Sequence, residues 1–118
     1  MTDLVACLST GKGTWGNVNR LIDEGKWEQI FLITNEFGKE NFSNEKKCNL
    51  IVVDPRKPLF ELIEEIRKSL DGKIKDTEVA LNLISGSGKE HMAIISAVMK
   101  LGLGFRQMAL TTDGLKEI

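Results

Sequence analysis

The chain has 118 residues and a net charge of −1, with 42% hydrophobic and 28% charged residues. This composition is ordinary for one globular domain, and it leaves too little chain for a cofactor domain joined to a separate substrate domain. A charge near zero excludes broad electrostatic attraction to DNA or to an anionic membrane, so any anionic ligand must be held by local groups.

The first part of the chain predicts two buried strands around a glycine-rich loop. Residues 4–8 (LVACL) form a continuous apolar run, typical of a strand covered on both faces. The loop at residues 9–16 (STGKGTWG) follows, and residues 17–25 carry apolar side chains at helical spacing. Residues 30–33 (IFLI) predict a second strand, which ends in a polar, turn-forming stretch at residues 34–38.

The middle of the chain predicts a strand and a helix. Residues 39–47 are polar and indicate a loop or a frayed helix, and residues 49–53 (NLIVV) predict the third strand. A segment with two prolines separates this strand from residues 59–70. Those residues predict the clearest helix, because apolar side chains recur on one face and charged ones on the other.

The last part of the chain contains a second glycine-rich loop. Residues 79–84 (VALNLI) predict the fourth strand, with Asn82 as an unexpected polar side chain. Residues 85–89 (SGSGK) lead into a helix over residues 90–101, whose mostly apolar sequence predicts burial on more than one side. Residues 105–110 predict a fifth strand before a short polar tail.

Strands that alternate with helices predict a single small α/β domain over residues 1–118. We expect a doubly wound, mostly parallel, five-stranded Rossmann-like sheet with helices on both faces. In this architecture the first strand lies beside the fourth, and ligands bind at their carboxyl ends. The two glycine-rich loops should therefore lie on opposite sides of one crevice.

Both loops carry groups suited to binding phosphate. Glycines let the backbone approach a ligand, and helix N-termini favour anions. The charged and hydroxyl donors are Lys12, Lys89, Ser9, Thr10, Ser85 and Ser87. The other candidate ligand-binding residues are Gly11, Gly13, Gly86, Gly88, Asn35, Asn82 and His91. The simpler interpretation is that both loops only make tight corners.

Other nucleotide motifs fit less well. A Walker A loop needs glycine where the chain has Leu83 and a hydroxyl residue where it has Glu90, which argues against an ATPase. The glycine spacing of residues 11–16 matches a NAD fingerprint, and Glu36, about 20 residues later, is placed to bind a ribose. The bulky Trp15 opposes close packing at this loop.

Metal and nucleophile chemistry is not indicated. One histidine and two distant cysteines offer no zinc-ligand cluster, so we expect no metal and no cofactor. His91 lacks the context of a serine hydrolase, and we interpret it as capping or lining the loop. Cys7 and Cys48 lie in apolar runs and should be buried and reduced. With no apolar run of the roughly 18 residues that a membrane helix needs, a cytoplasmic protein is expected.

Residues 82–92 (NLISGSGKEHM) resemble the second signature of the CARF family, the Rossmann-like sensors of CRISPR defence systems. There the fourth strand ends in Asn or Asp, followed by a hydroxyl residue, glycine, small residues, Lys or Arg, and an apolar helix. Residues 8–11 (LSTG) are similar to the family's first signature, a hydroxyl- and glycine-bearing loop after the first strand.

The resemblance implies that a homodimer binds cyclic oligoadenylate in a crevice between two copies, in CRISPR antiviral signalling. Some members also act as ring nucleases, in which a ribose 2′-hydroxyl attacks the neighbouring phosphate without a metal. The resemblance then assigns charge stabilisation to Lys89 and phosphate positioning to Ser9 or Thr10. It implies no membrane partner and no direct binding of DNA.

Most CARF proteins carry an attached effector domain, whereas this chain ends soon after its fifth predicted strand. We therefore expect a stand-alone domain that degrades the messenger, buffers it or acts through a separate partner. Two alternatives stay open. One is a NAD or other nucleotide-binding module of a larger complex, and the other is a non-enzymatic interaction domain that uses the helix at residues 90–101.

Overall fold

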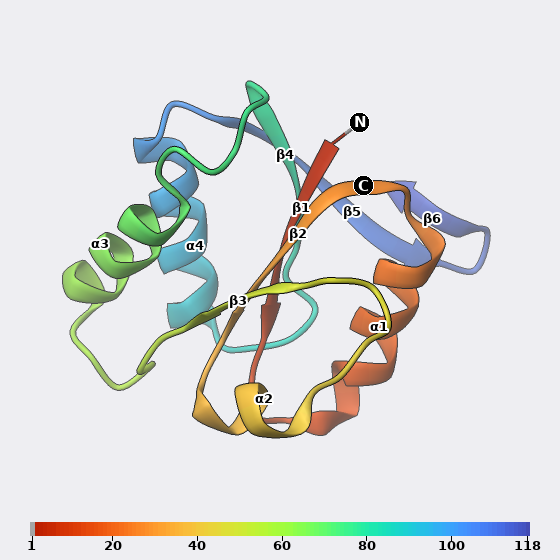
Figure 1. The fold of residues 1–118 in the computed structure, drawn as a ribbon, viewed down its shortest axis with the longest axis horizontal. Helices are drawn as coiled ribbons and strands as arrows, with labels where there is room; N and C mark the ends of the chain where they lie inside the picture. The colour runs from red at the N-terminus through yellow and green to blue at the C-terminus, as the bar shows by residue number, and fades with distance from the viewer. Residues whose placement is uncertain (1) are drawn as a thin grey trace.

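The computed structural model describes residues 2–118, apart from the side chain of Lys12 (Figure 1). Six strands are present in the described residues: β1 (Thr2–Leu8), β2 (Trp27–Thr34), β3 (Asn49–Val52), β4 (Glu78–Asn82), β5 (Gly104–Thr111) and β6 (Gly114–Glu117). The helices are α1 (Trp15–Glu24), α2 (Glu36–Asn41), α3 (Leu59–Leu70) and α4 (Gly88–Lys100), with a short 3₁₀ helix, η1 (Lys12–Thr14), before α1.

The strands form one mostly parallel sheet in the order β3-β2-β1-β4-β5-β6. β1 lies in the interior of the sheet, where Val5 pairs with Phe31 of β2 and with Leu81 of β4. β6 alone is antiparallel, and it pairs with β5. The α/β class, the parallel pairing and the adjacency of the first and fourth strands are thus as predicted.

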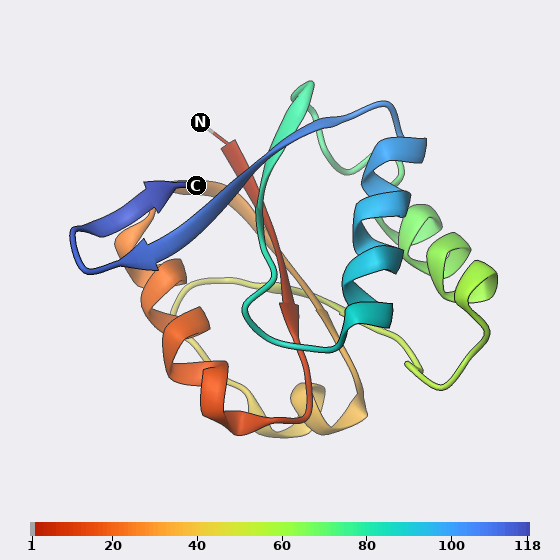
Figure 2. The ribbon, with the colours of Figure 1, turned by 180° about the vertical axis from the view of Figure 1, so that it is seen from behind.

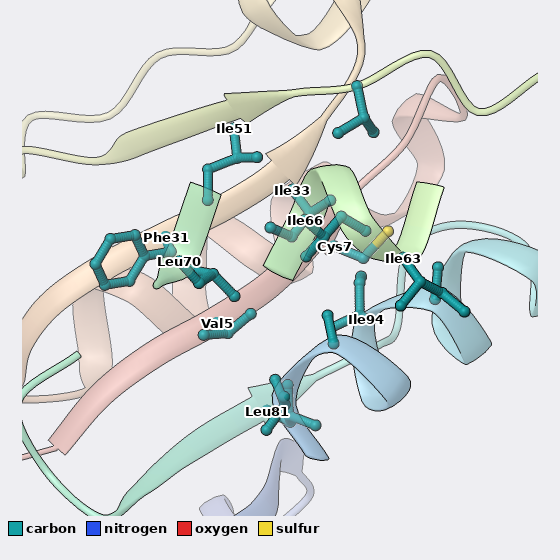
Figure 3. Packing of buried hydrophobic residues seen from close by; sticks show 14 of the residues in the cluster. Val5, Cys7, Phe31, Ile33, Ile51, Ile63, Ile66, Leu70, Leu81 and Ile94 are labelled. Carbon is teal, nitrogen blue, oxygen red and sulfur yellow. The ribbon is translucent and has the colours of Figure 1, made fainter. Parts of the chain in front are cut away.

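Helices cover both faces of the sheet, with α3 and α4 on one side and α1 on the other (Figures 1 and 2). Side chains alternate between the faces along β1, and residues 4–8 are all fully buried. Val5 and Cys7 pack with α3 and α4, as Figure 3 shows, whereas Leu4 and Ala6 pack with α1. Double coverage explains why this strand is a continuous apolar run.

The predicted five-stranded sheet is wrong by one strand, because the polar tail forms β6. The turn between β5 and β6 contains Asp113-Gly114, and Gly114 has a φ of +97°, which glycine adopts at little cost. Thr111 Oγ1 donates to the carbonyl of Gly114 across 2.9 Å, closing the turn. β6 pairs with β5 along its length, and its Leu115 packs against the core on the α1 side of the sheet.

The sequence predicts a turn at residues 34–38 and a loop or frayed helix at residues 39–47, whereas the structure has a regular helix over Glu36–Asn41. α2 begins at Glu36 because Asn35 caps it: Asn35 Oδ1 accepts a hydrogen bond of 2.9 Å from the backbone N–H of Gly38. Both cysteines are free, as predicted, and Cys7 is fully buried. Cys48 is only partly buried, so the prediction that it is buried is wrong.

α4 packs against both α3 and the sheet, in agreement with the predicted burial on more than one side, but one face of the helix stays exposed. Its inner face, which includes Ala93 and Ala97, packs against α3 and the sheet, whereas Met92 is 55% exposed and Met99 is 62% exposed. The helix lies in an outer layer, so its opposite face meets no other element of the described chain. None of the described helices is long and apolar enough to cross a membrane.

Candidate functional site

The two glycine-rich loops meet at the carboxyl ends of β1 and β4, as the sequence predicts. β1 continues toward α1 on one face of the sheet, and β4 continues toward α4 on the other. Neighbouring parallel strands whose connections diverge in this way leave a crevice between them. Figure 2 shows both connections at the same end of the sheet, opposite the chain termini.

Direct hydrogen bonds join the loops. The backbone N–H of Ser9 donates to Ser85 Oγ across 2.9 Å, and Ser9 Oγ donates to Glu90 Oε1 across 3.2 Å. Ser85 is almost completely buried, so its hydroxyl belongs to the wall of the site and not to its surface. These contacts bridge parts of the chain more than 70 residues apart and fix the relative position of the two loops.

An open cleft of about 380 Å³ lies between the loops. This volume falls within the range of small-molecule sites. The lining residues are Ser9, Gly11, Gly13, Thr14, Ile84, Gly86, Ser87 and Glu90. Five of them are predicted site residues, and both loops contribute to the list.

Glu90 is the functional candidate that sequence reasoning missed. Its carboxylate lines the cleft, although the residue is only 7% exposed. Glu90 Oε1 accepts a hydrogen bond of 2.9 Å from the N–H of Ser87, and the N–H of Glu90 donates to Ser87 Oγ. This reciprocal pair is a capping box at the start of α4. The signal is present in the sequence as Ser87-x-x-Glu90.

Gly86 is required by the shape of the site. Its φ is +106°, and a Cβ built on it would lie 2.6 Å from Cys7 Sγ and 3.2 Å from both Glu90 Oε1 and His91 Nε2. Burial, with a smaller contribution from the charge of Glu90, raises the pKa of Cys7 to about 12. Cys7 is therefore a neutral thiol in the floor below Gly86 and not a nucleophile.

The loop after β1 is held by two further contacts. Trp15 Nε1 donates to the carbonyl of Ser9 across 2.7 Å, and Asn35 Nδ2 donates to Thr10 Oγ1 across 2.7 Å. Because Asn35 also caps α2, it links Thr10 to the end of β2. Asn35 and Thr10 therefore flank the cleft without lining it.

The remaining predicted residues lie around the cleft. His91 Nε2 is 2.7 Å from the carbonyl of Ser85; since a carbonyl only accepts, this nitrogen carries the proton. Asn82 is buried and donates to the carbonyl of Met108, which links β4 to β5.

Gly88 and Lys89 are the first two residues of α4, and Lys89 forms no ion pair with any residue whose side chain is described. The Lys12 side chain lies outside the described residues.

A second cavity, of about 350 Å³, follows β2 and β3 and contains Glu36, the acidic residue of the NAD interpretation. The two cavities share no lining residue. Asn35 lines the same cavity as Glu36, and its side chain donates to Thr10 of the first glycine-rich loop. Across residues 2–118, no three His, Cys, Asp or Glu side chains gather as a metal site.

No family model matches the chain, and no curated protein matches its sequence.

Proposed function

We propose that this chain is a small doubly wound, Rossmann-like domain of the CARF type that binds and opens cyclic oligoadenylate. The observation that carries the proposal is the single cleft formed by two glycine-bearing loops at the ends of the neighbouring strands β1 and β4. The same two loops carry the sequence resemblance, at residues 8–11 and 82–92.

The N-terminus of α4 supplies donors for a phosphate. The capping box satisfies the amides of Ser87 and Glu90, and the amides of Gly88 and Lys89 have no acceptor within the first helical turn. A helix of 13 residues adds the partial positive charge of its dipole at this point. Lys89 adds a full positive charge to the first turn of this helix, between the lining residues Ser87 and Glu90 in the sequence. These groups support anion binding without a metal.

Thr10 is better prepared than Ser9 to position the phosphate. The Ser9 hydroxyl already donates to Glu90, whereas Thr10 Oγ1 accepts from Asn35 and keeps its own proton available. A ribose 2′-hydroxyl attacks the neighbouring phosphate in line when these contacts hold it in place. Lys89 then stabilises the negative charge that develops on the phosphate oxygens.

A second copy of the chain completes the site. One cleft of about 380 Å³ suits a drug-sized ligand and is smaller than a ring of four or six nucleotides. Met92 and Met99 are exposed on α4, and Ile84, which lines the cleft where this helix begins, is 50% exposed. Residues 91–99 contain no Asp, Glu, Lys or Arg, so two copies can meet about a twofold axis without opposing like charges.

Met92→Glu is expected to convert this dimer to monomers, because an isologous contact brings two new carboxylates together in an apolar interface. The dissociation constant should rise by at least about 100-fold, as light scattering coupled to size exclusion will measure. Phe60→Glu is the matched control, since Phe60 is 79% exposed and belongs to α3 and not to α4. Equal masses for the two variants would contradict the assignment of this face.

The proposed activity is tested by incubating the purified protein with cyclic tetra- and hexaadenylate in EDTA and separating the products by chromatography. We expect linear products that end in a 2′,3′-cyclic phosphate. Binding is followed separately by thermal unfolding, since a ligand at 100 times its dissociation constant stabilises by about 2.7 kcal/mol. If the protein binds the rings but does not cleave them, it acts as a sensor or a buffer of the messenger and not as a nuclease.

NAD serves as the comparison ligand in the same thermal experiment. Stabilisation by NAD, with no response to either ring, would contradict the proposal and favour a nucleotide module. An unchanged melting temperature with every nucleotide would favour the interaction domain.

A further inference from the structure

Glu90 places a free carboxylate oxygen at the cleft. Its Oε1 accepts from Ser9 Oγ and from the N–H of Ser87, and no described residue donates to its Oε2. Thr34 Oγ1 is the one fully buried side-chain polar atom of the described residues without a partner. Since Oε2 also lacks a partner, it must keep contact with solvent, and the cleft is the space that Glu90 lines.

A carboxylate oxygen only accepts hydrogen bonds. At this position it repels phosphate oxygens and attracts an O–H or N–H group of the ligand. The amides of Gly88 and Lys89, which begin the same helix, attract phosphate. The cleft thus favours a ligand that carries a hydroxyl next to a phosphate, which is the arrangement of a ribose 2′-hydroxyl beside its 3′-phosphodiester.

We infer that Glu90 is the general base of the ring-opening reaction, an inference that rests on the proposed function. Glu90 Oε2 takes the proton of the ribose 2′-hydroxyl while the 2′-oxygen forms its bond to phosphorus. The bond from phosphorus to the 5′-oxygen breaks, that oxygen takes a proton from water, and the Glu90 carboxyl returns its proton to the hydroxide that remains. The products are a 2′,3′-cyclic phosphate and a 5′-hydroxyl, so no oxidant, reductant or metal takes part.

Other groups near the cleft are unsuited to this step. The hydroxyls of Ser9, Thr14 and Ser87 are weak bases, and Glu90 is the only titratable side chain among the described lining residues. His91 does not line the cleft, and its Nε2 is held by the Ser85 carbonyl. The Cys7 thiol lies beneath Gly86 and is fully buried.

Glu90→Gln separates the chemical role from the structural one. The amide oxygen of glutamine can still accept from Ser9 Oγ and from the Ser87 N–H, so the capping box and the loop contact are retained. We expect kcat for ring opening to fall by about 100- to 10,000-fold, the range for loss of a general base. The melting temperature and the affinity for the ring should not fall. Glu64→Gln, at a carboxylate paired with Arg67 on α3, is the matched control with unchanged kcat.

The outcomes distinguish this inference from the function on which it rests. If the native protein opens the ring and Glu90→Gln opens it at the same kcat, Glu90 is only a capping residue and the inference is overturned. A variant that loses kcat and melting temperature together would also overturn it, because the effect would then be structural. If the native protein neither binds nor opens the rings, the proposed function itself is wrong.

Discussion

Gly86→Ala is expected to lower the free energy of unfolding by about 3 kcal/mol. A left-handed backbone costs an alanine roughly 1–2 kcal/mol. The new Cβ would lie 2.6 Å from Cys7 Sγ, and Cys7 is fully buried at the end of β1, so its sulfur can move only by disturbing the core. Equilibrium unfolding in urea measures the change directly.

Gly88→Ala is the matched control, two residues further on. A Cβ at this position meets nothing within 4 Å, and its φ is not positive. Because alanine favours a helix more than glycine does, this variant should stay within about 0.5 kcal/mol of the native protein or exceed it. Equal unfolding free energies for the two variants would mean that the loop at Gly86 is free to move, and the description of a rigid site wall would fail.

The strands were predictable because a strand that is covered on both faces appears in the sequence as a continuous apolar run. The apolar runs at residues 4–8 and 30–33 fall within observed strands, and the run at 49–53 covers β3 and extends one residue beyond its end. α3 was predicted with its observed bounds, since its charged outer face makes the helical period clear. β6 has no apolar run of this kind, because its formation depends on the Asp113-Gly114 turn and on pairing with the neighbouring β5.

The convergence of the two loops was predictable from the alternation of elements, but the interior of the cleft was not. Glu90 follows Lys89 in a polar stretch, where a charged residue is usually solvated. Only the fold brings Ser9 from the end of β1 to its carboxylate. The helix at residues 90–101 could be assigned neither to the core nor to an interaction surface for a related reason, since an apolar side chain such as Met92 gives the same sequence pattern in both.

Lys89→Ala is expected to slow ring opening by about 100- to 1,000-fold, the range for loss of one donor that stabilises transition-state charge. Lys89 begins α4 beside the cleft, and no described carboxylate neutralises it. Alanine keeps the backbone amide and the helix, so ring affinity should fall much less than kcat. Single-turnover chromatography of the products, beside a binding titration, measures the two effects separately.

Lys100→Ala is the control for net charge, because Lys100 is the last residue of the same helix. The two lysines are 11 residues apart, about 16 Å along the helix axis, which exceeds the Debye length of about 8 Å in physiological salt. A general loss of positive charge would slow both variants alike, whereas a local role slows Lys89→Ala alone. If Lys89→Ala opens the ring at the native rate, the free amides at the start of α4 carry the charge stabilisation by themselves, and the role given to the ammonium is wrong.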